Sequence, residues 1–294
     1  MSSCEKRILV TGATGLIGRE IVEPLQSHGF EVSAITIDAT NPDNGVRWIK
    51  GSLFDREFVA RTMDEFRPTH LLNMAWATTG DYLTNRINYD FLSAGIHLAN
   101  RFAAVGGCRA VYAGTCFEYA FKDEPIRESD PLEAGRNEYT FCKNELREVA
   151  DRIFKLADVS FGYGRIFYVY GRGEAKTRLT GMVIDKLSRG ERVLIKAGPL
   201  LKDYVYTKDI AGAFAALVDC DAEGPVNICT GRAISIRDYV MKIAEHMGKA
   251  DLVDFADDCA GQPPIVVGDA TRLNEEVGYR MRYSMEQAIE EIVR

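Results

Sequence analysis

The chain has 294 residues, of which 46% are hydrophobic, 27% charged and 10% aromatic, and this composition is typical of a folded globular protein. Its 43 acidic and 36 basic side chains give a formal net charge of -7, so we expect no binding to nucleic acid or to an anionic membrane. No apolar run reaches the roughly 18 residues of a membrane span, and the early residues lack a signal-peptide core, so the expected compartment is the cytoplasm.

The first half of the chain alternates short apolar runs with amphipathic segments. Strands are predicted at residues 7–11, 31–37, 70–75 and 109–112, and helices at residues 16–28, 56–66, about 93–105 and 139–156. Because strands and helices in this order connect by right-handed crossovers, the pattern predicts a parallel sheet with helices on both faces. The predicted fold class is therefore doubly wound α/β.

The second half is richer in glycine and proline, and its elements are less regular. We predict a first domain at residues 1–165, to which the chain returns at about 203–230. A second, smaller lobe is predicted at residues 166–202 and 231–294. No linker rich in serine or proline separates the two, so we expect them to pack together.

A glycine-rich turn, Thr-Gly-Ala-Thr-Gly-Leu-Ile-Gly at residues 11–18, follows the first predicted strand. Side chains at such a turn would keep the backbone away from a pyrophosphate, and the following helix start offers N–H groups and the positive end of its dipole. In this position the pattern favours a dinucleotide site over a plain tight turn. The predicted site includes Gly12, Thr14, Gly15 and Gly18.

The residues after the second predicted strand bear on which nicotinamide dinucleotide binds. An acidic side chain there would bind the ribose 2′-hydroxyl of NAD and repel the 2′-phosphate of NADP. The expected position carries Thr36, with Asp38 two residues further on, and Arg19 follows the last glycine of the turn. The sequence thus favours NADP over NAD, and NAD stays open because Asp38 could fold back toward the ribose.

A candidate catalytic group stands at the start of the last helix of the first domain. Tyr139 and Lys143 are four residues apart and so share one helix face, where the ammonium can lower the phenol's pKa and reach a cofactor ribose. A second pair with this spacing, Tyr204 and Lys208, lies in a strand-like run at a helix start, where a surface role for the lysine is simpler. Thr115 follows a strand whose carboxyl end should face the ligand crevice. We therefore predict hydride transfer at Thr115, Tyr139 and Lys143.

With these motifs, the chain resembles the extended short-chain dehydrogenases/reductases that act on nucleotide-sugars as epimerases, dehydratases and reductases. The resemblance covers nearly the whole chain. It is carried by TGATGLIG (11–18), GSLFD (51–55), HLLNMAW (70–76), VYAGTCFEY (111–119), YTFCK (139–143), RIFYVYGRGE (165–174), LKDYVYTKDIAGAF (201–214) and GDATRL (268–273). Together, in this order and spacing, these segments make the resemblance specific, although each segment alone is a weak signal.

The resemblance implies a Rossmann-type fold, a dinucleotide-binding first domain, a substrate-binding second lobe and further contacts. Those implied for the cofactor are Leu16, Ile17, Ser52, Leu53, Met74, Ala75, Trp76 and Phe167. Those implied for the nucleotide-sugar are Thr78, Cys116, Tyr168, Arg178 and Lys202. Ser52, Tyr168 and Lys202 replace the family's usual Asp, Asn and Arg. The implied site for the diphosphate therefore has fewer of the usual binding side chains than in the well-known epimerases.

The resemblance also implies a reaction. Tyr139 would be the general acid for ketone reduction or the base for alcohol oxidation, while Thr115 would hydrogen-bond the substrate oxygen. Dehydratases of the group carry an Asp-Glu pair after the threonine, where this chain has Cys116 and Phe117, so dehydration is disfavoured. The sequence favours reduction of a 4-keto (deoxy)sugar nucleotide. A C4 epimerase or dehydrogenase with tightly held NAD, a reductase of a small or steroidal carbonyl, and a non-catalytic nucleotide sensor stay open.

Other residues receive structural interpretations. The seven cysteines are scattered and the histidines isolated, so we expect reduced thiols and no metal. Arg101 and Arg109 are expected on the surface, and Glu118 either contacts substrate or packs its loop. The predicted helices near 93–105 and at 139–156 have apolar faces like those through which related enzymes pair, which predicts a homodimer by analogy.

Overall fold

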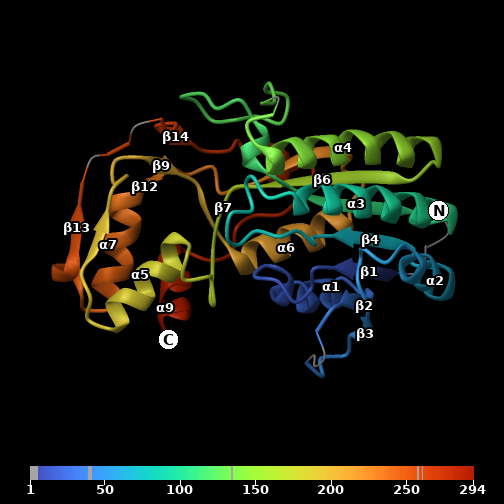
Figure 1. The fold of residues 1–294 in the computed structure, drawn as a ribbon, viewed down its shortest axis with the longest axis horizontal. Coiled ribbons are helices and arrows are strands. Elements are labelled where there is room, and N and C mark those ends of the chain that lie inside the picture. The colour runs from blue at the N-terminus through green and yellow to red at the C-terminus, as the bar shows by residue number, and fades with distance from the viewer. Residues whose placement is uncertain (1–5, 39–41, 134, 257, 260) are drawn as a thin grey trace.

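The computed structural model describes residues 6–38, 42–133, 135–256, 258–259 and 261–294. Its largest sheet has seven strands, all parallel, in the order β11-β6-β5-β4-β1-β2-β3 (Figure 1). In chain order these are β1 (Arg7–Thr11), β2 (Glu31–Thr36), β3 (Arg47–Lys50), β4 (His70–Asn73), β5 (Arg109–Thr115), β6 (Ser160–Ile166) and β11 (Gly224–Ile228). The predicted doubly wound α/β class is confirmed.

Helices cover both faces of this sheet because alternate strand residues are buried on opposite sides. On one face Ile8 and Val10 of β1 pack with α1 (Val22–Ser27) and α6 (Thr207–Val218). On the other face Leu9 packs with three helices. They are α2 (Arg56–Phe66), α3 (Ile87–Ala104) and α4 (Glu138–Leu156).

The structure departs from the predicted elements at several boundaries. The strand β3 was not predicted, because it is an edge strand of four residues in which only Trp48 and Ile49, between two charged residues, are apolar. The single helix predicted at 16–28 is a 3-10 turn, η1 (Gly18–Glu20), followed by the short α1. Helix α3 begins at Ile87, whose N–H donates to Asn85 Oδ1 at 2.9 Å, and not near residue 93. Strand β5 continues to Thr115 and so carries that side chain to the carboxyl end of the sheet.

The second lobe packs its own apolar core beside the sheet (Figure 1). Its helices are α5 (Leu179–Ser188), α7 (Ile236–His246) and α9 (Met285–Val293). Its strands are β7 (Tyr168–Tyr170) with β10 (Tyr204–Tyr206), β8 (Val193–Ile195) with β13 (Val253–Phe255), and β9 (Leu201–Lys202) between β12 (Ile234–Ser235) and β14 (Ile265–Val266). The chain is completed by η2 (Cys116–Glu118), η3 (Ala250–Leu252) and α8 (Thr271–Glu275). The division into 1–165 with 203–230, and 166–202 with 231–294, stays a prediction.

One expectation about surface charge is wrong. Arg109 is 6% exposed, and its guanidinium donates hydrogen bonds to Leu217 O and Ala222 O, both at 2.7 Å. These two carbonyls lie at and beyond the carboxyl end of α6, so a buried cation there satisfies backbone acceptors that the helix leaves open. Within the part of the chain that the structure describes, no helix combines the length and the apolar character that crossing a bilayer requires.

Candidate active site

A cavity of about 570 Å³ lies between the carboxyl end of the main sheet and the second lobe. Many of the predicted site residues line it. They are Gly12, Gly15, Leu16, Ile17, Gly18, Met74, Trp76, Thr78, Thr115, Cys116, Tyr139, Lys143, Phe167, Tyr168, Arg178 and Lys202. The cavity therefore joins the glycine turn, the three predicted catalytic side chains and the predicted substrate side chains in one continuous space.

The glycine turn fits a pyrophosphate. Gly12 has a positive φ of 77°, and a Cβ there would lie 2.8 Å from Ala75 N. A Cβ on Gly18 would lie 2.0 Å from Gly12 O, so both positions exclude any side chain. Gly15 and Ile17 lie between them and line the cavity, so the turn presents backbone to it. That is the cradle a dinucleotide pyrophosphate requires.

The remaining predicted cofactor residues do not line this cavity. Thr14 is exposed on the glycine turn, and Ala75 follows β4, where its N–H donates to Thr11 Oγ1 at 3.3 Å. Thr36 ends β2, and Ser52 and Leu53 follow the adjacent β3. These last three thus share the carboxyl edge of the sheet, as an adenosine site would require.

Asp38 and Arg19, the two charged side chains predicted to bear on cofactor choice, have defined neighbours. The Asp38 N–H donates to Thr36 Oγ1 at 3.0 Å, and the Thr36 hydroxyl lies 3.4 Å from the Asp38 carboxylate. Asp38 therefore folds back over the end of β2. Arg19 lies elsewhere, because a Cβ on Gly173 would be 2.8 Å from its Nη1, which places the guanidinium against the loop before α5.

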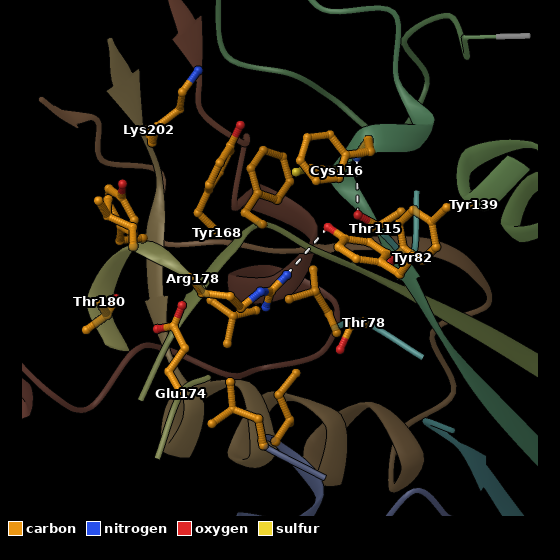
Figure 2. A pocket seen from close by; sticks show the side chains of 18 of the residues that line it. Thr78, Tyr82, Thr115, Cys116, Tyr139, Tyr168, Glu174, Arg178, Thr180 and Lys202 are labelled. Carbon is orange, nitrogen blue, oxygen red and sulfur yellow. Dashed lines mark hydrogen bonds between the residues drawn. The ribbon is translucent and has the colours of Figure 1, made fainter. Parts of the chain in front are cut away.

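Two of the three predicted catalytic side chains, Thr115 and Tyr139, face the same part of the cavity (Figure 2). Tyr139 is in the first turn of α4, which is fixed by its N-cap Asn137 accepting from Thr140 N at 2.9 Å. Burial raises the pKa of Tyr139 well above its usual range, nearby Tyr82 adds to the shift, and a hydrogen bond with Thr115 opposes it. The phenol consequently keeps its proton at neutral pH.

Lys143 lies one turn further along α4 and is 4% exposed. Its Nζ donates to Ala113 O at 2.7 Å and lies 4.0 Å from the centre of the Trp76 ring. Burial lowers the pKa of Lys143 to about 7, and the charge of Glu118 opposes that shift. The ammonium lies 6.0 Å from the centre of the Tyr139 ring, and burial is the largest influence on the phenol's pKa. That Lys143 lowers this pKa stays a prediction.

Glu118 packs its loop, one of the two roles that the sequence left open. Its carboxylate is fully buried, forms an ion pair with Arg165 at 2.9 Å and accepts from Tyr163 Oη at 2.8 Å. It also accepts from Thr115 N at 2.9 Å, while the Thr115 hydroxyl accepts from Phe117 N at 3.3 Å. This reciprocal capping box fixes Thr115, and the Thr-x-x-Glu spacing in the sequence is its signal.

Sequence reasoning missed two residues that line the cavity, Tyr82 beside Tyr139 and Glu174 beside Arg178. Tyr82 meets Tyr139 edge to face, with ring centres 5.1 Å apart, and its hydroxyl accepts from Arg178 Nη2 at 3.5 Å (Figure 2). Glu174 lines the cavity near Arg178, and burial raises the pKa of its carboxyl to about 7 against a hydrogen bond with Thr180. Both residues come from loops, and no local pattern in those loops marks them.

Three of the predicted substrate side chains, Tyr168, Arg178 and Lys202, lie across the cavity from Tyr139 (Figure 2). Lys202 is 2% exposed, donates to Pro263 O at 2.9 Å and lies 5.4 Å from the centre of the Tyr168 ring. Burial lowers the pKa of Lys202 to about 8. Arg178 is the N-cap residue of α5. No group of three potential His, Cys, Asp or Glu ligands for a metal ion is found among the described residues.

Known proteins are similar to this chain over most of its length. The model of the NAD dependent epimerase/dehydratase family matches residues 8–229. CDP-abequose synthase from Salmonella typhimurium is 22% identical, covering 100% of this chain and 99% of that protein. dTDP-6-deoxy-L-talose 4-dehydrogenase (NAD(+)) from Aggregatibacter actinomycetemcomitans is 27% identical, covering 81% and 90%. A crystal structure of UDP-glucose 4-epimerase from Thermus thermophilus in complex with NAD has a TM-score of 0.84 and 26% identity, covering 98% and 97%.

Proposed function

Because the chain belongs to the NAD dependent epimerase/dehydratase family, we propose that it reduces a 4-keto deoxysugar carried on a nucleoside diphosphate. The observation that carries the proposal is the pairing of Tyr139 and Thr115 within a cavity that continues to the glycine turn. Burial keeps the Tyr139 phenol protonated, which suits a general acid for ketone reduction. The relatives named for abequose and 6-deoxytalose support a deoxysugar.

The chain's own residues would divide the work as follows. Thr115 would donate a hydrogen bond to the ketone oxygen, where negative charge develops. Tyr139 would give its proton to that oxygen, completing the alcohol. Lys143 would bind the ribose that carries the nicotinamide. When bound, the reduced nicotinamide supplies the hydride to the carbonyl carbon and is itself oxidised.

The residues after Thr115 support reduction over dehydration. Elimination of water from a sugar needs groups that protonate the leaving hydroxyl and remove a proton from the neighbouring carbon. Cys116 is buried, which raises the pKa of its thiol above the usual range, and Phe117 carries no titratable group. Glu118, the next residue, is engaged by Arg165 and Tyr163. This supports a reaction that stops at the alcohol.

For the hydride donor we propose NADH in place of the NADPH that the sequence alone favoured. The Asp38 carboxylate folded over Thr36 would accept a hydrogen bond from a ribose 2′-hydroxyl and repel a 2′-phosphate. Arg19, the cation expected to bind that phosphate, lies against the loop at Gly173. In Asp38→Ala, kcat/KM for NADH should fall roughly 10- to 150-fold, since a hydrogen bond to a charged group contributes about 1.5–3 kcal/mol. Kinetics with NADH and with NADPH measure this. If the ratio of kcat/KM for NADH to that for NADPH is the same in Asp38→Ala and wild type, the result counts against NADH.

The substrate experiment uses the purified protein with 4-keto-6-deoxy sugars on dTDP, CDP and UDP, each with NADH and NADPH. Loss of the reduced nicotinamide absorbance together with a new nucleotide-sugar alcohol by mass spectrometry is the expected result. An epimerase holding its NAD tightly is the alternative, which the similarity to UDP-glucose 4-epimerase in complex with NAD supports. Nicotinamide that survives dialysis, with interconversion of UDP-sugars and no net oxidation of added NADH, would establish that alternative and overturn the reductase.

A further inference from the structure

The indole of Trp76 is held on several sides within the cavity. Its ring stacks on Phe91, with ring centres 5.3 Å apart and planes 23° apart. Its Nε1 donates to Asn88 Oδ1 at 2.8 Å, and Asn88 is fully buried. A side chain fixed by both a stacked ring and a buried hydrogen bond has little rotamer freedom, so the direction of its π face is set by the fold.

That π face meets the ammonium of Lys143. The distance of 4.0 Å from Nζ to the ring centre lies well within the roughly 6 Å range of cation–π attraction. An ammonium has three N–H groups. One of them bonds Ala113 O at 2.7 Å and the indole faces another side, so one direction is left for a ligand in the cavity.

We propose that Trp76 is a positioning residue, which stabilises the charge of the Lys143 ammonium and directs its remaining N–H toward the cofactor ribose. The inference rests on the proposed function through the role of Lys143. The need for such a residue is electrostatic, because an almost fully buried ammonium is costly without partners. The Glu118 carboxylate is already engaged by Arg165 and Tyr163, so the indole supplies attraction that Glu118 only partly provides.

The same contacts connect Lys143 to the segment over Tyr139. The Asn88 Nδ2 donates to Tyr82 O and Asn85 O, both at 2.7 Å. Asn88 thus fixes the indole through its oxygen and the Tyr82 segment through its nitrogen. Tyr82 packs on Tyr139, so one buried amide aligns the supports of both predicted catalytic side chains on α4.

A fluorescence titration tests the Trp76–Lys143 contact without cofactor or substrate. The chain has two tryptophans, and Trp48 in β3 is the other, so Trp48→Phe leaves Trp76 as the sole indole emitter. Besides Trp76, the titratable groups near the Lys143 ammonium among the described residues are Glu118 of η2 and Tyr139 of α4, while Tyr163 of β6 donates to the backbone carbonyl of Lys143.

A protonated amine quenches indole emission, so emission should rise as Lys143 loses its proton, with a midpoint near pH 7. The step should vanish in Trp48→Phe/Lys143→Met. A step that persists in this double variant, or no step in Trp48→Phe, would overturn the contact.

A substitution series tests the positioning role. In Trp76→Leu the alkaline fall of kcat/KM should move to lower pH by roughly 0.5–1.5 units, since lost cation–π attraction lowers the pKa of Lys143. NADH binding at pH 8 should weaken in parallel. Trp76→Phe keeps a π face and should restore most of both properties.

Trp48→Leu makes the same change outside the cavity and is the matched control, with unfolding midpoints compared for every variant. Equal pH profiles for Trp76→Leu and wild type would overturn the positioning role. If the wild type reduces no nucleotide-sugar, the proposed function fails, while the fluorescence titration and the NADH-binding pH profile still decide the Trp76 inference.

Discussion

At the scale of single residues, burial determines the chemistry of the cavity. It raises the pKa of Tyr139, so the phenol stays protonated. It lowers the pKa of Lys143 to about 7, so the amine becomes neutral just above neutral pH. An acid that releases its proton only to a developing alkoxide is suited to reduction. The ring of Tyr82 packs edge to face against Tyr139, and its charge adds to the shift that burial causes.

Removal of the phenolic hydroxyl tests the acid directly. Tyr139→Phe should lower kcat by about 10²–10⁴-fold, the contribution of a general acid, and should leave NADH binding within about twofold of wild type. A nicotinamide absorbance assay measures the loss of turnover, and a fluorescence titration measures the retained NADH binding. Activity within tenfold of wild type would remove Tyr139 from the mechanism.

The buried carboxyl of Glu174 should give stability a pH dependence. Its pKa rises from 4.5 to about 7 on folding, so the proton stabilises the folded state at low pH. That contribution is complete below about pH 4.5 and is lost as pH rises through about 7. Glu174→Gln removes this titration. As the pH rises from 5 to 8, the free energy of unfolding of the variant should therefore increase by about 1–3 kcal/mol relative to that of wild type. Urea unfolding at both pH values measures the gain, and a constant difference between the proteins would contradict it.

At the scale of elements, different glycines of the turn between β1 and α1 serve its fold and its opening toward a phosphate. Gly18 has no room for a Cβ because Gly12 O would lie 2.0 Å away, whereas a Cβ on Gly15 would lie 3.2 Å from the same oxygen. Gly12 and Gly18 therefore hold the turn together. Gly15 lines the cavity and leaves it open to a phosphate.

Two alanine substitutions should separate these requirements. Gly15→Ala should keep an unfolding midpoint close to wild type while weakening NADH binding at least roughly 10-fold, because the methyl group stands where the pyrophosphate approaches. Gly18→Ala should lose both stability and binding. Calorimetry and NADH titration of the pair distinguish the two effects, and tight NADH binding by Gly15→Ala would argue against a cofactor at this turn.

Elements with strong periodicity were predictable and those made by tertiary contacts were not. The prediction for α2 matches its observed bounds, and that for α4 differs by one residue at its start, because both are long amphipathic helices with Asp55 and Asn137 as N-caps. The strand β3 is the last of the described strands in the main sheet, next to β2, and its pattern is too short to detect. The motif residues from Gly12 to Lys143 were found because they adjoin regular elements. Tyr82 and Glu174 lie in loops whose paths depend on Asn88 and α5.

At the scale of the whole molecule, an acidic chain places cations where anionic ligands are expected. The net charge is -7, yet Arg178 and Lys202 line the cavity. Both are held in place by the fold, Lys202 by Pro263 O and Arg178 by Tyr82 Oη. Local positive potential in an acidic protein suits small anions such as a nucleotide-sugar and disfavours long polyanions.

The outer faces of α3 and α4 support the predicted homodimer. Tyr89 on α3 is 46% exposed and Phe141 on α4 is 41% exposed. Sedimentation should give the mass of two chains for wild type and of one chain for Tyr89→Glu/Phe141→Glu. Ile37, 75% exposed near the opposite edge of the sheet, supplies the control Ile37→Glu, which should stay dimeric. A wild-type mass of one chain at micromolar concentration would refute the dimer.

The path of the chain has a consequence for how the molecule can be divided. Strand β6 of the main sheet leads into β7 of the second lobe, β10 leads back into α6 on the sheet, and β11 is followed by β12 and α7 in the lobe. Because β7, α5 and β10 all lie between β6 and β11, no single cut yields one fragment with the whole sheet and another with the whole lobe. Neither the sheet nor the lobe is therefore encoded by one contiguous segment of the chain, and we expect neither to fold when expressed as a single fragment.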